Sequence, residues 1–476
     1  MIENLEKYLR NKQQRFTLNE AAVATGLSVD ETRSALDELI RKYIARIQVT
    51  ENGDLIYDFG KPLRRWGEKT AAEKWQSFLD WCWKVFKVVF KAWITVTLVA
   101  YFVIFVVILL VLLFANSSDK SGKRGSVNLS GLSHIFFAIF RWNTATGTTL
   151  YRTDNRGYRY REYQPIQSTL KRNKKSFIAA VYDFVFGPPR VEPDPLNNQK
   201  EAAAFLNKEK GVVVMAELEA LAGWTNQQAE QFFTECLVRF EGEAKVNENG
   251  VVYGEFDNII RGIGKADENQ IVYYWDEYEP EYELNGNSKT QNMWIFLMNG
   301  FNLLFSSLVV SGKLAGLAGL ASQGDASMLA GSLIGAILSG KLLLGWIPLI
   351  FSIVFVLVPL LRYLQIQTAR QKRHHHNIRK RFYKIIFQTR AQPQTLEAVH
   401  YAINENASEE TLSKEITKTM LEELVLNLKG ETTVSEDGKV LYHFPRTALE
   451  LSEVQKIREK RKPPDTLGEI IMDSEG

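Results

Sequence analysis

The sequence lacks the features that mark most enzymes and disulfide-bonded proteins. Only two cysteines, Cys82 and Cys236, occur in 476 residues, far apart and outside any CxxC pattern. This predicts neither a disulfide framework nor a thiolate metal site, and it favours a reducing compartment. No glycine-rich phosphate loop, HExxH, GxSxG or carboxylate pair at a catalytic spacing is present. The sequence therefore predicts no enzyme activity, no catalytic residues, no cofactor and no metal.

Charge is missing from one long stretch. From Ala92 to Phe114 the chain has 23 uncharged residues, and a helix of that length is about 34 Å long. Because the apolar core of a bilayer is about 30 Å thick, this segment is predicted to cross it. A mean hydropathy of −0.17 indicates that most of the chain lies outside the membrane. We expect an α+β protein with several membrane-spanning helices and soluble domains.

Two further apolar stretches, 293–310 and 342–361, are each about long enough to span. Asn299 and Asn302 in the first would be costly against lipid, so they are expected to face protein or water. Helix packing explains them more simply than a permeation path. Basic residues follow the last stretch, which places the next domain on the cytoplasmic side and predicts contact with anionic lipid. They are Arg362, Arg370, Lys372, Arg373, Arg379, Lys380 and Arg381.

The first apolar stretch has lysines on both sides, so charge does not orient it. A short apolar segment at 127–142 could form a fourth crossing or lie in the interface, and both three and four passes stay open. Just before residue 92 comes an aromatic series with interleaved lysines, which suits either the lipid headgroups or packing on a neighbouring domain. It comprises Trp75, Phe78, Trp81, Trp83, Phe86 and Phe90.

The soluble part of the chain repeats itself. Glu51–Phe59, Glu248–Phe256 and Glu436–Phe444 each contain Asn-Gly or Asp-Gly, with the glycine six residues before a phenylalanine. Such a dipeptide after an alternating apolar segment predicts a β-hairpin, because both residues tolerate a positive φ. Two helical patterns precede each hairpin. Since duplicated domains most simply share one compartment, the repeat argues for an even number of crossings between the first two copies.

Helix, turn, helix and hairpin together are the order of a winged-helix domain. In the first copy Gly26 separates the two helices, and Ser28 with Glu31 predicts a capping box. We expect winged-helix-like domains at 1–65, 200–265 and 391–450. The other predicted segments are 70–145, an interfacial helix and first span; 146–199, a basic linker and amphipathic segment; 266–290, an acidic linker; 291–363, a membrane hairpin; 364–390, a basic helix; and 451–476, a charged tail.

A winged helix that reads DNA presents cations and amides on its second helix. The first copy instead presents Asp30, Glu31, Asp37 and Glu38 against Arg33. The second copy offers glutamines without a nearby cation, and the third is acidic. Because an acidic face repels phosphates, the sequence favours protein partners over nucleic acid.

Three consecutive histidines, His374 to His376, could suggest a metal site. Consecutive residues point in different directions on a helix, and these stand among arginines and lysines in RQKRHHHNIRKR. A solvated or headgroup-facing basic helix explains them without a metal.

The order of several short motifs resembles an uncharacterised family of membrane proteins from cyanobacteria and plant chloroplast envelopes. The motifs are SFIAAVYDFVFGPP from Ser176, GVVVMAE from Gly211, RFEG from Arg239, the hairpin Gly250–Phe256, and an apolar span running into a basic helix over 359–381. Where that family has an acidic, glycine-rich run after the Phe-Gly turn, this chain has Pro188, Pro189 and Arg190. Some members carry a name linked to iron–sulfur biogenesis, but two isolated cysteines predict no cluster. The resemblance implies topology and domain order, and it implies no catalytic residues.

The leading expectation is a non-enzymatic scaffold in the cytoplasmic membrane. Its soluble domains would lie mainly on the cytoplasmic side and would bind proteins, while its helices and basic residues contact lipid. The alternatives are a membrane-anchored regulator that binds nucleic acid and a transport component that uses the polar second span. The protein partners and any homo-oligomer are left open by the sequence.

Overall fold

The computed structural model describes residues 2–11, 15–60, 63–66, 71–117, 152–153, 159–160, 176–188, 194–262, 270–277, 284–314, 335, 340–405, 410–461 and 467–474. The segment 127–142, proposed above as a fourth crossing, lies outside them.

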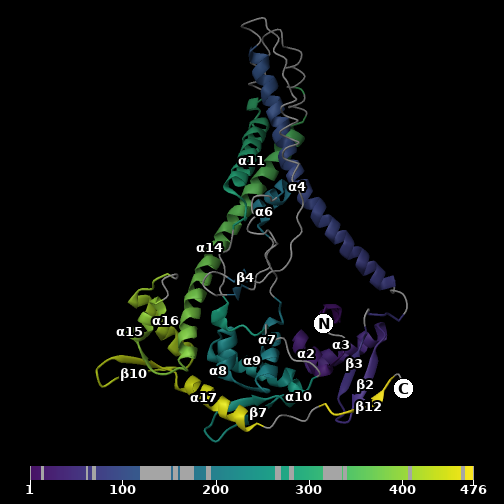
Figure 1. Cartoon of the computed structure of the whole chain (residues 1–476). Helices are drawn as coiled ribbons and strands as arrows, with labels where there is room; N and C mark the ends of the chain where they lie inside the picture. Colours follow the sequence, from purple (N-terminus) through teal and green to yellow (C-terminus); the bar gives the residue numbers. More distant parts are fainter. Residues whose placement is uncertain are drawn as a thin grey trace.

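Long apolar helices gather at one end of the molecule, and the sheets lie at the other (Figure 1). The helices are α4 (Ala71–Ser117), α11 (Lys289–Val310) and α14 (Ile347–Gln388), which continues from the short π-helix η3 (Lys341–Trp346). Within the described residues, these three are long and apolar enough to cross a membrane. The three predicted apolar helices are therefore confirmed, and two of them continue far beyond the predicted spans.

A short helix, α6 (Phe177–Phe186), packs among the three long ones. Val181 on α6 is fully buried in a cluster with Leu98 of α4, Ile295 of α11 and Phe355 of α14. Ser176 caps the helix through its hydroxyl, which accepts the amide of Ala179 at 3.2 Å. Part of the segment 146–199, expected to be a basic linker and amphipathic segment, is thus a structural element of the apolar bundle.

The first unit contains α1 (Ile2–Asn11), β1 (Arg15–Thr17), α2 (Leu18–Thr25), α3 (Val29–Lys42), β2 (Arg46–Thr50) and β3 (Leu55–Asp58). Strand β3 pairs antiparallel with both β1 and β2. The predicted capping box of Ser28 and Glu31 is present at the start of α3. Gly26 takes φ of 70° between the two helices, as a left-handed helix end requires.

The same order of elements occurs twice more. The second unit has β6 (Val212–Val214), α8 (Met215–Ala222), α9 (Asn226–Arg239), β7 (Glu243–Val246) and β8 (Val252–Glu255), preceded by α7 (Asn197–Lys208) and followed by α10 (Asp257–Ile260). The third has β9 (Gln394–Thr395), α15 (Leu396–Asn404), α16 (Lys414–Asn427), β10 (Glu431–Val434) and β11 (Val440–His443). In each unit the last strand lies between the other two. The three predicted hairpins are confirmed, and Gly53, Gly250 and Gly438 take φ of 81°, 79° and 72° in their turns.

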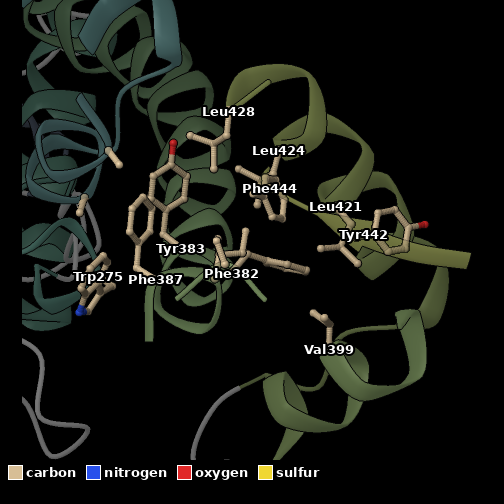
Figure 2. Packing of buried hydrophobic residues seen from close by; sticks show 14 of the residues in the cluster. Trp275, Phe382, Tyr383, Phe387, Val399, Leu421, Leu424, Leu428, Tyr442 and Phe444 are labelled. Carbon is tan, nitrogen blue, oxygen red and sulfur yellow. The ribbon is translucent and has the colours of Figure 1, made fainter. Parts of the chain in front are cut away.

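Helix α14 ends inside the third unit. Phe382 and Tyr383 are fully buried there (Figure 2). Phe387 stacks on Trp275 of the short 3₁₀ helix η2 (Tyr274–Asp276), with 5.6 Å between ring centroids. The surrounding leucines come from α16 and the residue after it: Leu421, Leu424 and Leu428. The C-terminal end of α14 is therefore part of the hydrophobic core of the third unit, and burial of these side chains holds the two together.

The last 26 residues, expected to be a charged tail, include the end of a helix and a strand. Helix α17 (Pro445–Lys460) follows the third unit and packs on the second. Strand β12 (Ile470–Asp473) then pairs antiparallel with β2 of the first unit. The only other pair of strands in the described residues is β4 (Arg152–Thr153) with β5 (Arg159–Tyr160).

Candidate functional site

Asn299 and Asn302 of α11 face protein. Asn302 is fully buried and donates its side-chain amide to the carbonyl of Leu98 on α4 at 2.9 Å. Asn299 donates to the carbonyl of Ser352 on α14 at 3.2 Å. These bonds join α11 to both long neighbours, so they support the packing interpretation over a permeation path.

The seven basic residues predicted to face lipid do not share one environment. Arg370 and Lys372 are exposed on α14, and Arg373 is half-buried. The guanidinium of Arg362 lies directly over Gly187, where even a Cβ atom would collide with it. Arg362 thus packs on the end of α6, whereas Arg370 and Lys372 are exposed.

The basic residues nearest the third unit contact protein. Lys380 is buried, with its ammonium 5.0 Å from the centre of the Tyr274 ring. Arg379 donates to the hydroxyl of Tyr383 at 3.0 Å. Arg381 donates to the carbonyls of Ile403 and Glu410 at 2.5 and 2.9 Å. Lys380 does not face lipid, because the packing of α14 against η2 encloses it.

Two of the three consecutive histidines face acidic residues of the third unit. His375 lies 2.9 Å from a carboxylate oxygen of Glu423, and His374 lies 3.8 Å from Glu410. No cluster of three or more metal-ligating side chains occurs among the described residues. The histidines connect α14 with the third unit.

The aromatic series before the first apolar stretch is largely exposed. Trp75 is 61 % exposed and Phe86 is 53 % exposed. Phe90, at the end of the series, contacts Phe186 of α6, and Lys91 lies over the ring of Tyr182. The described residues therefore cover the end of the series and leave its beginning open to lipid or to another chain.

The second helices of the first two units present polar residues outward. On α3, Asp37 and Glu38 are exposed, and the Arg33 guanidinium is paired with Asp30 at 3.7 Å. On α9 the exposed side includes Gln227, which is uncharged. The acidic residues and glutamines from which the sequence analysis argued against DNA binding are thus exposed on these helices.

The first two units contact each other directly. Arg239 at the end of α9 donates to the carbonyl of Gly26 at 3.1 Å and lies 3.5 Å from the Glu31 carboxylate. The hydroxyl of Thr17 donates to the carbonyl of Arg261 at 3.4 Å. A Cβ atom at Gly26 would also meet the second unit, at Lys200 and Leu196. The glycine thus both ends a helix and admits a neighbouring unit.

The densest group of buried charges lies between the second unit and α17. Arg446 of α17 donates to Glu219 of α8 and, at 2.7 Å, to Glu450 one turn along α17. Glu219 is fully buried and Glu450 nearly so. Glu450 also accepts the backbone amide of Ala216 at 2.7 Å, at the first turn of α8. One arginine therefore holds two buried carboxylates and caps a helix through one of them.

A second arginine of α17 makes a parallel set of contacts. Arg458 lies 2.8 Å from Glu217 and 3.1 Å from Glu209, and it donates to the carbonyl of Val212 at 2.8 Å. Arg461, just after the helix, donates to the carbonyl of Gly211 at 3.0 Å. We call five of the side chains that join α17 to the second unit the arginine–glutamate ladder. Its members are Glu217, Glu219, Arg446, Glu450 and Arg458.

Burial raises the pKa of each glutamate of the ladder above its ordinary value, although the arginines oppose the shift. The pKa of Glu219 rises to about 7. Sequence reasoning missed this site because its partners are more than 200 residues apart. A signal existed in MAELEALA, where Glu217 and Glu219 interrupt an apolar helix. Because the ladder is enclosed, it is suited to holding elements together rather than to binding a substrate.

No protein-family model matches the chain, and no solved structure matches it. Among curated proteins, it is similar to the uncharacterized chloroplastic protein At5g03900 of Arabidopsis thaliana, with 21 % identity over 283 residues. The match covers 57 % of this chain and 51 % of that protein, so the chain spans about half the length of this relative. The comparison agrees with the expected likeness to an uncharacterised plant protein, and it carries no activity with it.

Proposed function

We propose that this protein is a membrane-anchored scaffold whose three winged-helix units form one assembly and bind protein partners. The observation that carries the proposal is the threefold recurrence of one strand order, with all three units joined at the same end of the apolar helices (Figure 1). Because a fold alone does not determine function, the proposal is argued from the contacts and exposed charges of the three units.

The contacts between units support a common side of the membrane. Arg239 reaches the first unit, and Arg446 and Arg458 reach the second from α17. If α4 crosses the bilayer, units on opposite sides could not make these contacts. An even number of crossings between the first two units is then required, which favours four passes over three. By the positive-inside rule, the exposed Arg370 and Lys372 favour the cytoplasmic side for this end.

The charges on the second helices argue for protein over nucleic acid. A helix in the major groove approaches phosphates on both sides, and α3 would bring the exposed Asp37 and Glu38 toward them. The guanidinium of Arg239, which could have supplied positive charge, is engaged between the first two units. A polar face on which exposed carboxylates stand beside Arg33 and Arg41 suits a protein surface of mixed polarity better.

Binding of the purified full chain to fluorescent duplex DNA between 50 and 300 mM salt tests this choice. We expect no saturable binding at micromolar concentration. Proteins captured from native membranes in mild detergent should include at least one that is lost with the D37R/E38R variant. Micromolar DNA binding that weakens steeply with salt would contradict the proposal, because that dependence reports phosphate contacts.

A further inference from the structure

The first unit differs from the other two at the outer edge of its sheet. Its strands run in the order β1-β3-β2-β12, whereas the other two sheets each end at their third strand in the described residues. The fourth strand comes from the C-terminus, more than 400 residues away along the chain. A three-stranded sheet suffices for the second and third units, so β12 is an addition to the first rather than part of it.

The main chain of β12 is held at both ends. The amide of Glu51 donates to the carbonyl of Glu469 at 2.9 Å, and the amide of Ser474 donates to the carbonyl of Ile47 at 2.9 Å. The hydroxyl of Ser474 also accepts the amide of Ile47 at 2.9 Å. Between these points the register shifts at Ile470 and Met472. This is the pattern by which an extended peptide adds to a sheet edge.

One carboxylate of the added strand is recognised specifically. The guanidinium of Arg46 donates to both oxygens of Asp473, with Nε–Oδ1 at 2.7 Å. Gln48 donates to the same carboxylate at 2.7 Å, and its own oxygen accepts from Arg15 at 2.8 Å. Arg15 thereby orients the Gln48 amide with its donor toward Asp473. A fork and an oriented amide form a built site for a carboxylate.

Apolar burial contributes little to the attachment of β12. Ile470 is 44 % exposed, Ile471 is 64 % exposed and Met472 is 66 % exposed. The strand is therefore held by main-chain bonds and by Asp473, and elements that bury few apolar side chains open at low free-energy cost. Its three exposed apolar side chains also do not pack into the core of the first unit.

We propose that the outer edge of β2 is a binding site for an extended acidic peptide of a partner protein, and that the segment Gly468–Ser474 is its exchangeable intramolecular occupant. The partner segment would pair with Arg46–Glu51 and place a carboxylate where Asp473 lies. This inference rests on the proposed scaffold role and names the class of partner for the first unit. Because a tethered strand has an effective concentration of about 1 mM, it competes strongly with a free peptide.

The test uses the labelled peptide LGEIIMDSEG, which is residues 467–476 of the chain. It should bind a variant that ends at Thr466 saturably, and the full chain at least tenfold more weakly. A peptide with Asp473→Ala should bind the shortened variant at least tenfold more weakly, because it loses the charge-assisted bonds. Equal binding to both chains would overturn the proposal, as would absent binding to a shortened chain whose β3 amides stay protected from hydrogen exchange.

A measurement on the full-length chain remains decisive if the shortened variant does not fold. The R46A substitution should speed hydrogen exchange in residues 469–474 at least tenfold and leave β3 unchanged, whereas R41A, an exposed arginine on α3, should change neither. The proposal fails if residues 469–474 of the natural chain exchange as slowly as β3, since a permanent strand cannot be replaced. Loss of this site alone would leave the scaffold proposal standing, because partner capture and DNA binding are measured separately.

Discussion

Removal of the Arg446 guanidinium should detach α17 from the second unit. In the R446M variant the apolar stem remains, but Glu219 and Glu450 lose the cation that both contact. Breaking a buried ion pair by removing one partner costs about 3–5 kcal/mol, because a charge is left buried without compensation. The carboxylates can escape this cost only by binding protons.

The size of the defect should depend on pH. Keeping one buried carboxyl group neutral costs about 1.4 kcal/mol for each pH unit above its ordinary pKa, which is 4.5 for glutamate. The cost is thus about 2 kcal/mol at pH 6 and about 5 kcal/mol at pH 8. In R446M, the docking of α17 on the second unit should therefore be far less stable at pH 8 than at pH 6.

Hydrogen exchange at the amide of Ala216 provides the assay, because this amide donates to Glu450. We expect exchange at pH 8 to be at least a hundredfold faster in R446M than in the natural chain, after correction for intrinsic rates. K456M is the matched control on the same helix, since Lys456 is largely exposed and pairs with Glu453 one turn away. Unchanged protection in R446M, or equal effects of the two substitutions, would refute the structural role of the ladder.

Three further predictions concern the ladder, a helix end and the apolar bundle. The folded-state pKa of Glu219 is raised to about 7, so its proton stabilises the docked state at low pH. The melting temperature should therefore fall as the pH rises from 6 to 8. The E219Q variant should show a smaller fall over the same range. At Gly223, φ is +68° and an aromatic ring lies where a Cβ would stand, so G223A should lower the melting temperature by several degrees more than G250A, whose φ is +79° in open space. N302L removes the bond to the Leu98 carbonyl and should destabilise the detergent-solubilised chain by about 1 kcal/mol, measured by thermal unfolding; a neutral or stabilising effect would contradict its packing role.

Local features of the fold were predictable because their causes lie within a few residues. The dipeptide at Asn52 and Gly53 fixes a hairpin by backbone geometry. Ser28 and Glu31 cap α3 through bonds only three residues apart. The apolar helices follow from length and composition alone. None of these required knowledge of a distant partner.

The missed features all depend on distant partners. Nothing near Ile470 indicates that it pairs with Thr50, and the apolar, aspartate-containing segment resembles a tail. The basic residue Lys380 has the same local surroundings in sequence as its neighbours, yet only the fold places Tyr274 over it. The charged helix α17 was missed for the same reason, because its glutamate partners belong to another unit.

The claim that the three units form one assembly on a single side of the membrane is tested most directly by cysteine labelling. In a chain with Cys82→Ala and Cys236→Ala, single cysteines replace Asp37, Glu230 or Glu436, which are exposed in the three units. A membrane-impermeant maleimide is added to sealed vesicles of one orientation, before and after permeabilisation. The account predicts that all three positions label together in the same condition. Labelling of Asp37→Cys from the side opposite to Glu230→Cys would contradict it.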